Sequence, residues 1–500
     1  MKKLVLVLIM LSFVSSCHRQ VQVKKYEPTW ESLSQWEVPQ WFDEAVLGIY
    51  CHWGVYSVPG YRFNDGAEQV DSGLWYGMFM YVPNDSGQPN YGVYDHHRKT
   101  YGDPAEFGYH DFVPMFKAEN WDPDSWAKLY KEAGADFAGV AVEHCDGFVL
   151  WDTEFDKYNC MDMGPQRDIL GEMFAAARKL GMKTVATFHE TPEEMFEAGR
   201  KYCPEGVSVN NPEYKELYEV DDISVKNKKL LEVVDKYKPD QVWFEDEFCG
   251  EENWKPFLAY YFNTAEKWGK QVMIAQKHGE APLSCSVLDI EGGIFPDGVW
   301  EWAGMEEPQQ QRWQKDVPIG NYWAYAEGVG CRPVNMLVDG IVDRISKNGV
   351  TLLDVAPKAD GALPKAQIEG LKELGAWMAI NKEALYAAKP AHFVEGGADI
   401  WRAGSLRYTE KGNHLYAIEL GNEWPTTLGF ADYGDSDPPN TPYTVPGVRP
   451  VKDSEILMLG SNMSLPWHQD GDDLVIEELP DPLPCDHAWS FKIQVNDVTD

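Results

Sequence analysis

Apolar runs of strand length recur between residues 46 and 358, and segments with helical patterns separate most of them. The segment from Asp122 has a capping residue followed by proline, and the amphipathic segment from Arg167 stops at Gly181. Continuous apolar strands that alternate with helices are typical of a parallel sheet covered by helices. The candidate strands are 46–54, 137–144, 183–190, 240–247, 271–278, 285–293, 321–327 and 350–358. Eight such units predict an α/β fold, a (β/α)₈ barrel.

Polar residues end most of these predicted strands. In a (β/α)₈ barrel the carboxyl ends of the strands meet at one rim, and the active site lies there. So many polar strand ends on one rim are hard to explain by stability alone. They are His52, His144, His189, Glu245, His278, Glu291 and Glu327. We therefore predict that the rim is the active site and that His189 binds substrate there.

The sequence pattern changes after about residue 390, where short alternating strands and turns replace the long apolar runs. The segments 399–420, 454–479 and 488–495 show this alternation. They predict a β-sandwich domain over 389–500 that follows a catalytic barrel over 30–388. Bracing of the barrel is the favoured role of the sandwich, and carbohydrate binding is the alternative.

The N-terminus has the pattern of a secretory signal. Two lysines precede an apolar stretch from Leu4 to Val14, which is too short to span a membrane as a helix. Small residues then lead directly to Cys17, as in the lipobox of bacterial lipoproteins. We expect a signal peptide over 1–17, lipidation of Cys17 and a polar tether over 18–29, which would anchor the protein to a membrane facing the periplasm or cell exterior. An ordinary signal peptide with a chance cysteine is the alternative.

Composition excludes several classes of partner. The formal net charge of −36 argues against nucleic acid and anionic lipid surfaces, since both attract positive patches, so a lipid anchor is the one membrane contact that we expect. The cysteines form no CxxC pair, which argues against cysteine-ligated zinc. The histidines show no HxxxH or HxH spacing and no compact ligand set, so we expect no metal and no cofactor. The 20 Trp and 25 Tyr residues suit a core and also stacking on sugar rings.

Two carboxylates, Glu245 and Glu291, end different strands in otherwise apolar surroundings. Glycosidic cleavage needs one ionised carboxylate to attack the anomeric carbon and one protonated carboxyl to assist the leaving oxygen. Period-two alternation places Glu245 on the same side as Trp243, facing the site and its substrate, and turns Asp246 toward the helices. A local bulge would instead bring Asp246 forward. Glu301, which lies between two tryptophans, is the alternative to Glu291.

Several short motifs follow one another between about Trp41 and Pro390. They are LGIYCHWGVYSVPGY, EHCDGFVLWD, RDILGEM, KYKPDQVWFEDEF, YYFNTAEKWGKQV, VLDIEGG and SKNGVTLLDVAPKADGALP. In content and order the chain resembles the α-L-fucosidases of glycoside hydrolase family 29. The resemblance implies an exo-acting, retaining glycoside hydrolase that works through a covalent glycosyl-enzyme.

The resemblance also implies roles for single residues. His52 matches a family histidine that contacts a sugar hydroxyl, and His144 matches the first residue of a histidine pair. Trp75 and Tyr76 match the tryptophan and tyrosine of the family's Glu-Trp-Tyr motif, and Glu291 matches an acid/base glutamate. We therefore expect these residues to line the site.

Four positions depart from the family pattern. Glu245 replaces the nucleophilic aspartate, Leu74 a glutamate, Cys145 the second histidine of the pair, and Glu143 a lysine. The extra methylene of Glu245 moves its carboxyl by roughly 1.5 Å, which keeps Asp246 as the alternative nucleophile. Leu74 and Cys145 make the pocket less polar, and Cys145 is expected to contact the substrate.

These observations predict an enzyme that releases terminal α-L-fucose, or the related α-L-galactose, from oligosaccharides or polysaccharides. L-Fucose is 6-deoxy-L-galactose, so a reshaped pocket with extra room could admit a hydroxyl at C6. A catalytically silent glycan-binding lipoprotein of the same fold is the second hypothesis, and a metal-dependent hydrolase is the third.

Overall fold

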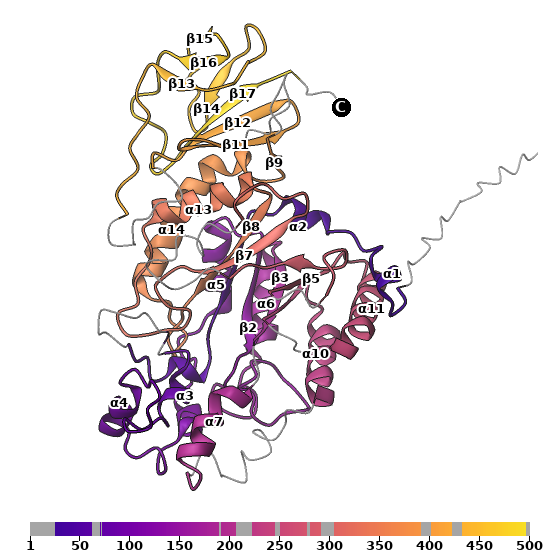
Figure 1. Ribbon diagram of the computed structural model, residues 1–500, viewed down its shortest axis with the longest axis vertical. Helices are drawn as coiled ribbons and strands as arrows, with labels where there is room; N and C mark the ends of the chain where they lie inside the picture. The colour runs from indigo at the N-terminus through magenta and orange to yellow at the C-terminus, as the bar shows by residue number, and fades with distance from the viewer. Residues whose placement is uncertain are drawn as a thin grey trace, which may run out of the picture.

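The computed structural model describes residues 26–62, 71, 73–189, 192–206, 223–245, 251–277, 281–291, 305–391, 402–422 and 433–496. A central barrel carries antiparallel sheets at one end, and the helices α3 (Tyr76–Phe79), α4 (Val93–Thr100) and α7 (Pro192–Tyr202) gather at the other (Figure 1). Within the described ranges, no helix has the length and apolar content needed to cross a membrane. Cys17 and the predicted leader lie outside these ranges.

The barrel consists of eight parallel strands. They are β1 (Leu47–Cys51), β2 (Phe137–Glu143), β3 (Lys183–Phe188), β4 (Gln241–Phe244), β5 (Met273–Gln276), β6 (Val287–Leu288), β7 (Trp313–Pro318) and β8 (Gly349–Val355). They pair in the order β6–β5–β4–β3–β2–β1–β8–β7. A parallel bridge between Asp289 and Gln314 joins β7 to the segment after β6 and closes the circle. The predicted (β/α)₈ barrel is confirmed.

Helices follow most strands and cover the barrel. The longer helices are α5 (Pro123–Glu132), α6 (Ile169–Lys179), α7 (Pro192–Tyr202), α10 (Ile223–Tyr237), α11 (Glu251–Trp268), α13 (Val334–Ser346) and α14 (Lys365–Asn381). The shorter helical segments are α1 (Trp30–Leu33), α2 (Gln40–Glu44), η1 (Val55–Ser57), α3 (Tyr76–Phe79), α4 (Val93–Thr100), η2 (Tyr109–Met115) and η3 (Lys382–Ala384). The cap predicted for α5 is present, since the Asp122 carboxylate accepts from the backbone N–H groups of Asp124 and Ser125 at 3.1 and 3.3 Å.

The seventh strand lies elsewhere than predicted. Residues 321–327 form an irregular segment, and β7 is Trp313–Pro318. The prediction failed because β7 carries buried polar residues and so lacks an apolar run. These residues have internal partners: the Gln314 amide donates to Asp289 Oδ2 at 2.6 Å, and the Lys315 ammonium donates to the Glu291 carbonyl at 3.0 Å. Glu327 is consequently an exposed turn residue and not a strand end.

The C-terminal part contains two antiparallel sheets. Their strands are β9 (Lys389–Pro390), β10 (Arg402–Ala403), β11 (Leu406–Lys411), β12 (His414–Glu419), β13 (Tyr443–Val445), β14 (Ile456–Met458), β15 (Trp467–Asp470), β16 (Asp473–Ile476) and β17 (Trp489–Gln494). They enclose an apolar core of their own. Helices α13 and α14 lie between these sheets and the barrel (Figure 1). The buried Arg407 guanidinium of β11 binds Asp343 of α13 at 2.7 Å, and the Trp377 indole of α14 donates to the Ala488 carbonyl at 2.9 Å.

Candidate active site

Three histidines stand at the carboxyl ends of the first three strands. His52, His144 and His189 are each the first residue after their strand, and all three are buried. Their ring centroids lie 4.6 to 5.2 Å apart. Burial is the main cause that lowers the pKa of each imidazole, and the mutual repulsion of the histidines adds to it for His52 and His144. The rings are therefore neutral near pH 7, and each offers one hydrogen-bond donor and one acceptor.

Neighbouring groups hold these rings in place. His52 Nδ1 lies 3.0 Å from Asp354 Oδ1 at the inner side of β8, and the same oxygen accepts from the His52 backbone N–H at 2.7 Å. His189 Nε2 lies 2.9 Å from the Thr187 hydroxyl. Nδ1 of His144 is buried and makes no hydrogen bond to any described residue. A buried polar atom without a partner is costly, so His144 is the ring that most needs a ligand hydroxyl.

Glu245 follows β4 directly and faces this cluster, as the alternation predicted. Its Oε2 lies 3.1 Å from His189 Nδ1, and its Oε1 accepts from the Lys277 ammonium at 2.7 Å. Trp243 lies two residues earlier on the same side. The centroid of its ring is 4.8 Å from the centroid of the His189 ring. Burial raises the pKa of Glu245, but the Lys277 charge and the His189 hydrogen bond outweigh it and hold the pKa well below its usual range. Asp246 lies outside the described residues.

Sequence reasoning missed Lys277, which binds both candidate catalytic carboxylates. Its ammonium lies 2.7 Å from Glu245 Oε1 and 3.0 Å from Glu291 Oε2, and it stands over the Trp243 ring at 5.1 Å from the centroid. Burial lowers its pKa, but the surrounding carboxylates raise it well above the usual value, so Lys277 stays charged. A signal was present: Lys277 is the first residue after β5, the same position that His52 holds after β1. The predicted strand ended two residues beyond β5 and pointed instead to His278, which lies outside the described residues.

Glu291 lies three residues beyond β6, and its side chain is 47% exposed. The apolar surroundings expected for it are absent from the described structure, where its nearest partner is the charged Lys277. Because Lys277 contacts both carboxylates, Glu245 Oε1 and Glu291 Oε2 are separated by no more than the sum of 2.7 Å and 3.0 Å. Glu301, the alternative acid/base, lies outside the described residues.

Of the remaining predicted binding residues, Trp75 lies near the three histidines and Tyr76 does not. Trp75 is half-buried, and the centroid of its ring lies 6.2 Å from the centroid of the His144 ring. Cys145 and Leu74 are both buried. Tyr76 is buried in an aromatic cluster near α4, where its hydroxyl lies 3.3 Å from His97 Nδ1. Among the described contacts, none joins Tyr76 to the three histidines or to Glu245.

A buried ion pair lies behind the His144 strand end. The Lys229 ammonium of α10 binds Glu143 Oε1 at 2.6 Å and Asp156 Oδ2 at 3.0 Å. Asp146 accepts from the Tyr109 hydroxyl at 2.8 Å and from the Phe148 backbone N–H at 3.2 Å. These contacts fix the chain on both sides of His144 and Cys145.

The expectation that no compact set of metal ligands exists is wrong for the described structure. One nitrogen from each of His52, His144 and His189 can be chosen so that all lie within 4.8 Å of one another. Zinc–nitrogen bonds of 2.0–2.1 Å keep two nitrogens on one ion no more than about 4.2 Å apart. A metal would also have to coexist with the Lys277 ammonium and displace existing hydrogen bonds. The same ring nitrogens are also suited to hydrogen bonds with a polyhydroxylated ligand.

Comparisons with known proteins identify the family of this chain. The family model described as Alpha-L-fucosidase matches residues 13–383. The chain is 28% identical to the human tissue alpha-L-fucosidase over 98% of this chain and 96% of that protein. It is 27% identical to an alpha-L-fucosidase of Dictyostelium discoideum over 83% of this chain and 86% of that protein.

A solved structure shows the same relationship. The alpha-fucosidase of Thermotoga maritima in complex with fucose superposes with a TM-score of 0.70 at 26% identity, over 93% of this chain and 100% of that one. With more than half of the sequence matched by the family model, the chain belongs to the α-L-fucosidase family and is a glycoside hydrolase.

Proposed function

We propose that this protein is an exo-acting, retaining hydrolase of terminal α-L-fucosyl or α-L-galactosyl glycans, with Glu245 as nucleophile and Glu291 as acid/base. The Lys277 bridge is the observation that carries this proposal. It limits the distance between Glu245 Oε1 and Glu291 Oε2 to the sum of 2.7 Å and 3.0 Å. Carboxyl groups of retaining glycosidases lie about 5–5.5 Å apart, whereas those of inverting enzymes lie about 6.5–9.5 Å apart.

The proposed reaction has two steps. Ionised Glu245 attacks the anomeric carbon while Glu291 transfers its proton to the leaving glycosidic oxygen, which gives a glycosyl ester of Glu245. Glu291 then removes a proton from water, the water oxygen attacks the anomeric carbon, and the Glu245 carboxylate leaves. Lys277 and His189 bind Glu245 before the attack and after its departure. They also fix the position of a carboxylate that is one methylene longer than aspartate.

Neutral histidines would recognise the sugar hydroxyls. The contact with Asp354 fixes His52 through Nδ1 and leaves its Nε2 for a ligand. His144 Nδ1 has no partner among the described residues, and a sugar hydroxyl would supply one. Trp75, whose ring approaches His144, would supply an apolar wall for the sugar ring.

Leu74 and Cys145 support the inclusion of L-galactose. Both side chains are buried, and the two residues are adjacent in sequence to Trp75 and His144. Leu74 is less polar, and Cys145 smaller, than the family residue that it replaces. The additional space would accept the C6 hydroxyl that distinguishes L-galactose from L-fucose. Membrane anchoring through Cys17 is a further part of the proposal and rests on the leader pattern.

Parallel assays on p-nitrophenyl α-L-fucoside and α-L-galactoside test the proposed activity. We expect release of p-nitrophenol from at least one of them, unchanged after treatment with a chelator. Cys145→His, which restores a bulkier ring, should lower the rate on the galactoside relative to the fucoside. Sugar binding without release from either substrate would instead support the glycan-binding hypothesis, and loss of activity after chelation would support a metal-dependent hydrolase.

A further inference from the structure

A cavity lies at the opposite end of the barrel strands from the active site. This basal pocket has a volume of about 500 Å³, and its walls include Trp41, Lys131, Lys183, Lys382, Tyr386 and Lys411. Lys183 begins β3, and Asp136 on the pocket wall directly precedes β2, whereas His144 directly follows β2. The seven residues of β2 span roughly 20 Å. The basal pocket is therefore separate from the active site.

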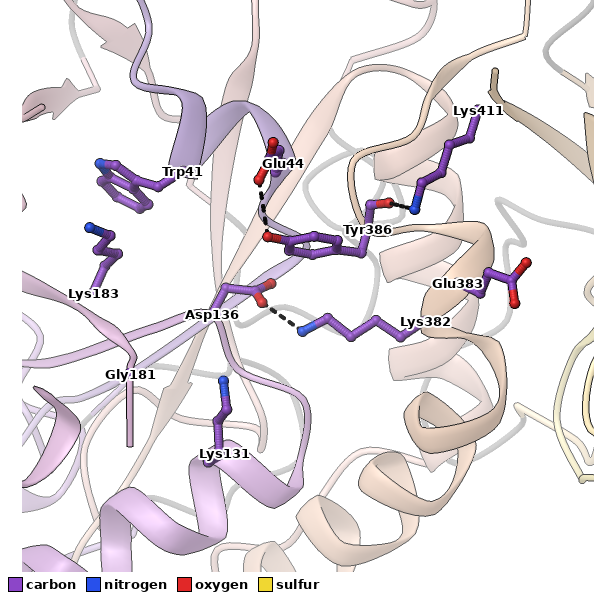
Figure 2. Close-up of a pocket in the computed structure, with 10 residues that line it drawn as sticks. All are labelled: Trp41, Glu44, Lys131, Asp136, Gly181, Lys183, Lys382, Glu383, Tyr386 and Lys411. Atoms are coloured by element: carbon purple, nitrogen blue, oxygen red, sulfur yellow. Dashed lines mark hydrogen bonds and ion pairs between the residues drawn. The ribbon is translucent and has the colours of Figure 1, made fainter. Parts of the chain in front are cut away.

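Two acids in the basal pocket are already neutralised by lysines. Asp136 binds the Lys382 ammonium at 2.6 Å and also accepts from the Val46 backbone N–H at 2.8 Å. Glu383 binds the Lys492 ammonium at 2.5 Å. In Figure 2 the Lys382 ammonium points at Asp136, and the Glu383 carboxylate points away from the other side chains.

The other lysines give the pocket an excess of positive charge. Lys131 has no acidic partner within 4.0 Å among the described residues, and its ammonium points upward from α5 (Figure 2). Lys183 lies 3.9 Å from Asp240, which already has Lys270 at 3.2 Å. Lys411 donates to the Tyr386 carbonyl at 3.1 Å.

The third acid of the pocket is Glu44, whose carboxylate points at Tyr386 in Figure 2. It accepts from the Tyr386 hydroxyl at 3.0 Å. Such a concentration of ammonium groups is unexpected on a chain with 80 acidic and 44 basic residues. The positive charge of the pocket therefore favours binding of an anion.

Its aromatic walls and size indicate what kind of anion would fit. The Trp41 indole is anchored by a hydrogen bond to the Gln271 carbonyl at 3.1 Å and by edge-to-face contact with Phe137. The Tyr386 side chain is 36% exposed and offers a second ring. Rings of this kind pack against the C–H faces of sugars, and a cavity of 300–1,000 Å³ is typical of small-ligand sites.

We propose that the basal pocket binds an acidic sugar unit, one that carries a carboxylate or a sulfate ester, of a polysaccharide. Lys131 and Lys183 would bind the anionic group, and Trp41 or Tyr386 would contact the sugar ring. Such a site would hold an acidic polymer on the enzyme while the active site acts on a terminal residue. The proposal is independent of which carboxylate attacks in the active site.

Isothermal titration calorimetry at low salt tests this site with three probes. They are an oligogalacturonate, the same oligosaccharide as its methyl ester, and a sulfated oligosaccharide. We expect the full-length protein to bind at least one charged probe about tenfold more tightly than the neutral ester, with weaker binding as salt rises. Comparison of the two charged probes identifies whether carboxylate or sulfate is preferred.

Matched variants locate the binding. The double variant Lys131→Ala, Lys183→Ala should weaken binding of the charged probe about tenfold or more, while Lys131→Arg, Lys183→Arg should retain it. Lys128→Ala is the control, because Lys128 lies on the same helix with its side chain 72% exposed and outside the pocket. All variants should hydrolyse aryl glycosides at the wild-type rate. Equal binding of charged and neutral probes, no binding, or an equal effect of Lys128→Ala would overturn the proposal.

Discussion

At the scale of single residues, the Lys277 ammonium connects the two carboxylates of the proposed reaction. A buried cation favours the ionised form of a neighbouring acid most strongly when that acid is desolvated with it. Glu245 is that residue, since its side chain is 17% exposed while that of Glu291 is 47% exposed. The difference in exposure suits one carboxylate for attack and leaves the other accessible to the proton exchange that an acid/base needs.

Substitution of Lys277 should change how the rate depends on pH. The depressed pKa of Glu245 keeps its carboxylate ionised below the usual range, so the acidic limb of kcat/KM lies at low pH in the wild type. Lys277→Met removes the positive charge, and the pKa of Glu245 should rise. The acidic limb should then move to higher pH. Lys277→Arg keeps the charge and should retain the wild-type limb; an unmoved limb in Lys277→Met would mean that Lys277 does not tune Glu245.

Substitution of Glu291 should affect substrates according to their leaving groups. Glu291→Gln cannot protonate the departing oxygen, so natural glycans, whose sugar alcohols are poor leaving groups, should lose about 10²–10⁴-fold in rate. p-Nitrophenyl glycosides need little protonation and should lose much less. Rates on both substrate types are measured with the same enzyme preparation. Equal losses on both types would remove Glu291 from the acid/base role and direct attention to Glu301.

The site residues that sequence reasoning identified are those that follow strands with clear apolar patterns. His52, His144, His189 and Glu245 were found because β1 to β4 have such patterns, and the structure brings these four together. Lys277 was missed because a strand end cannot be placed to within one residue from hydrophobicity alone. The packing of Tyr76 against His97 could not be foreseen either, because it depends on α4, a polar helix distant in sequence.

At the scale of elements, β7 shows where the periodicity argument fails. A barrel interior is normally filled by apolar side chains, so apolar runs predict its strands. β7 instead carries buried Lys315 and Asp316. The Lys315 ammonium donates to the Glu291 carbonyl at 3.0 Å, and Asp316 Oδ2 accepts from the Tyr50 hydroxyl at 3.5 Å, while Asp316 Oδ1 has no hydrogen-bond partner among the described residues. The burial of Asp316 raises its pKa well above the usual value, and the nearby Asp289 raises it further. Such a strand cannot be recognised from a single sequence, since its partners are contributed by distant residues.

The contact between α10 and β2 gives a prediction about stability. Lys229→Met leaves Glu143 and Asp156 buried or half-buried without their cation, and loss of one member of a buried ion pair costs about 3–5 kcal/mol. The free energy of unfolding in urea should fall by that amount. Lys228→Met on the same helix changes an exposed lysine and should have little effect. Similar stabilities of the two variants would mean that the Lys229 contacts contribute nothing to the fold.

At the scale of the whole molecule, the architecture followed from sequence more readily than the site did. Alternating strands and helices determine a (β/α)₈ barrel because each repeated unit adds a strand to the same parallel sheet. The short antiparallel strands after residue 389 were also foreseen as a separate kind of structure. The ion pair between Arg407 and Asp343 joins the C-terminal sheets to the barrel. Such contacts cannot be predicted from the local sequence pattern. The bracing role of the sandwich stays a prediction.

Cellular location is also a property of the whole molecule. If Cys17 is lipidated, the full-length protein should be recovered in the membrane fraction and be released by detergent. Cys17→Ser removes the acceptor thiol and should yield a soluble or unprocessed protein. Fractionation followed by immunoblotting distinguishes these outcomes. A wild-type protein found wholly in the soluble fraction would show that the leader is an ordinary signal peptide.

The identity of the nucleophile decides the mechanism, and trapping of the covalent intermediate measures it directly. A 2-fluoro glycosyl fluoride of L-fucose or L-galactose should label the protein once, and fragmentation of the peptide that contains VWFEDEF should place the sugar on Glu245. Glu245→Ala should abolish labelling and lower kcat by several orders of magnitude, with partial rescue by azide as an external nucleophile. An adduct on Asp246, with labelling retained in Glu245→Ala, would contradict the account.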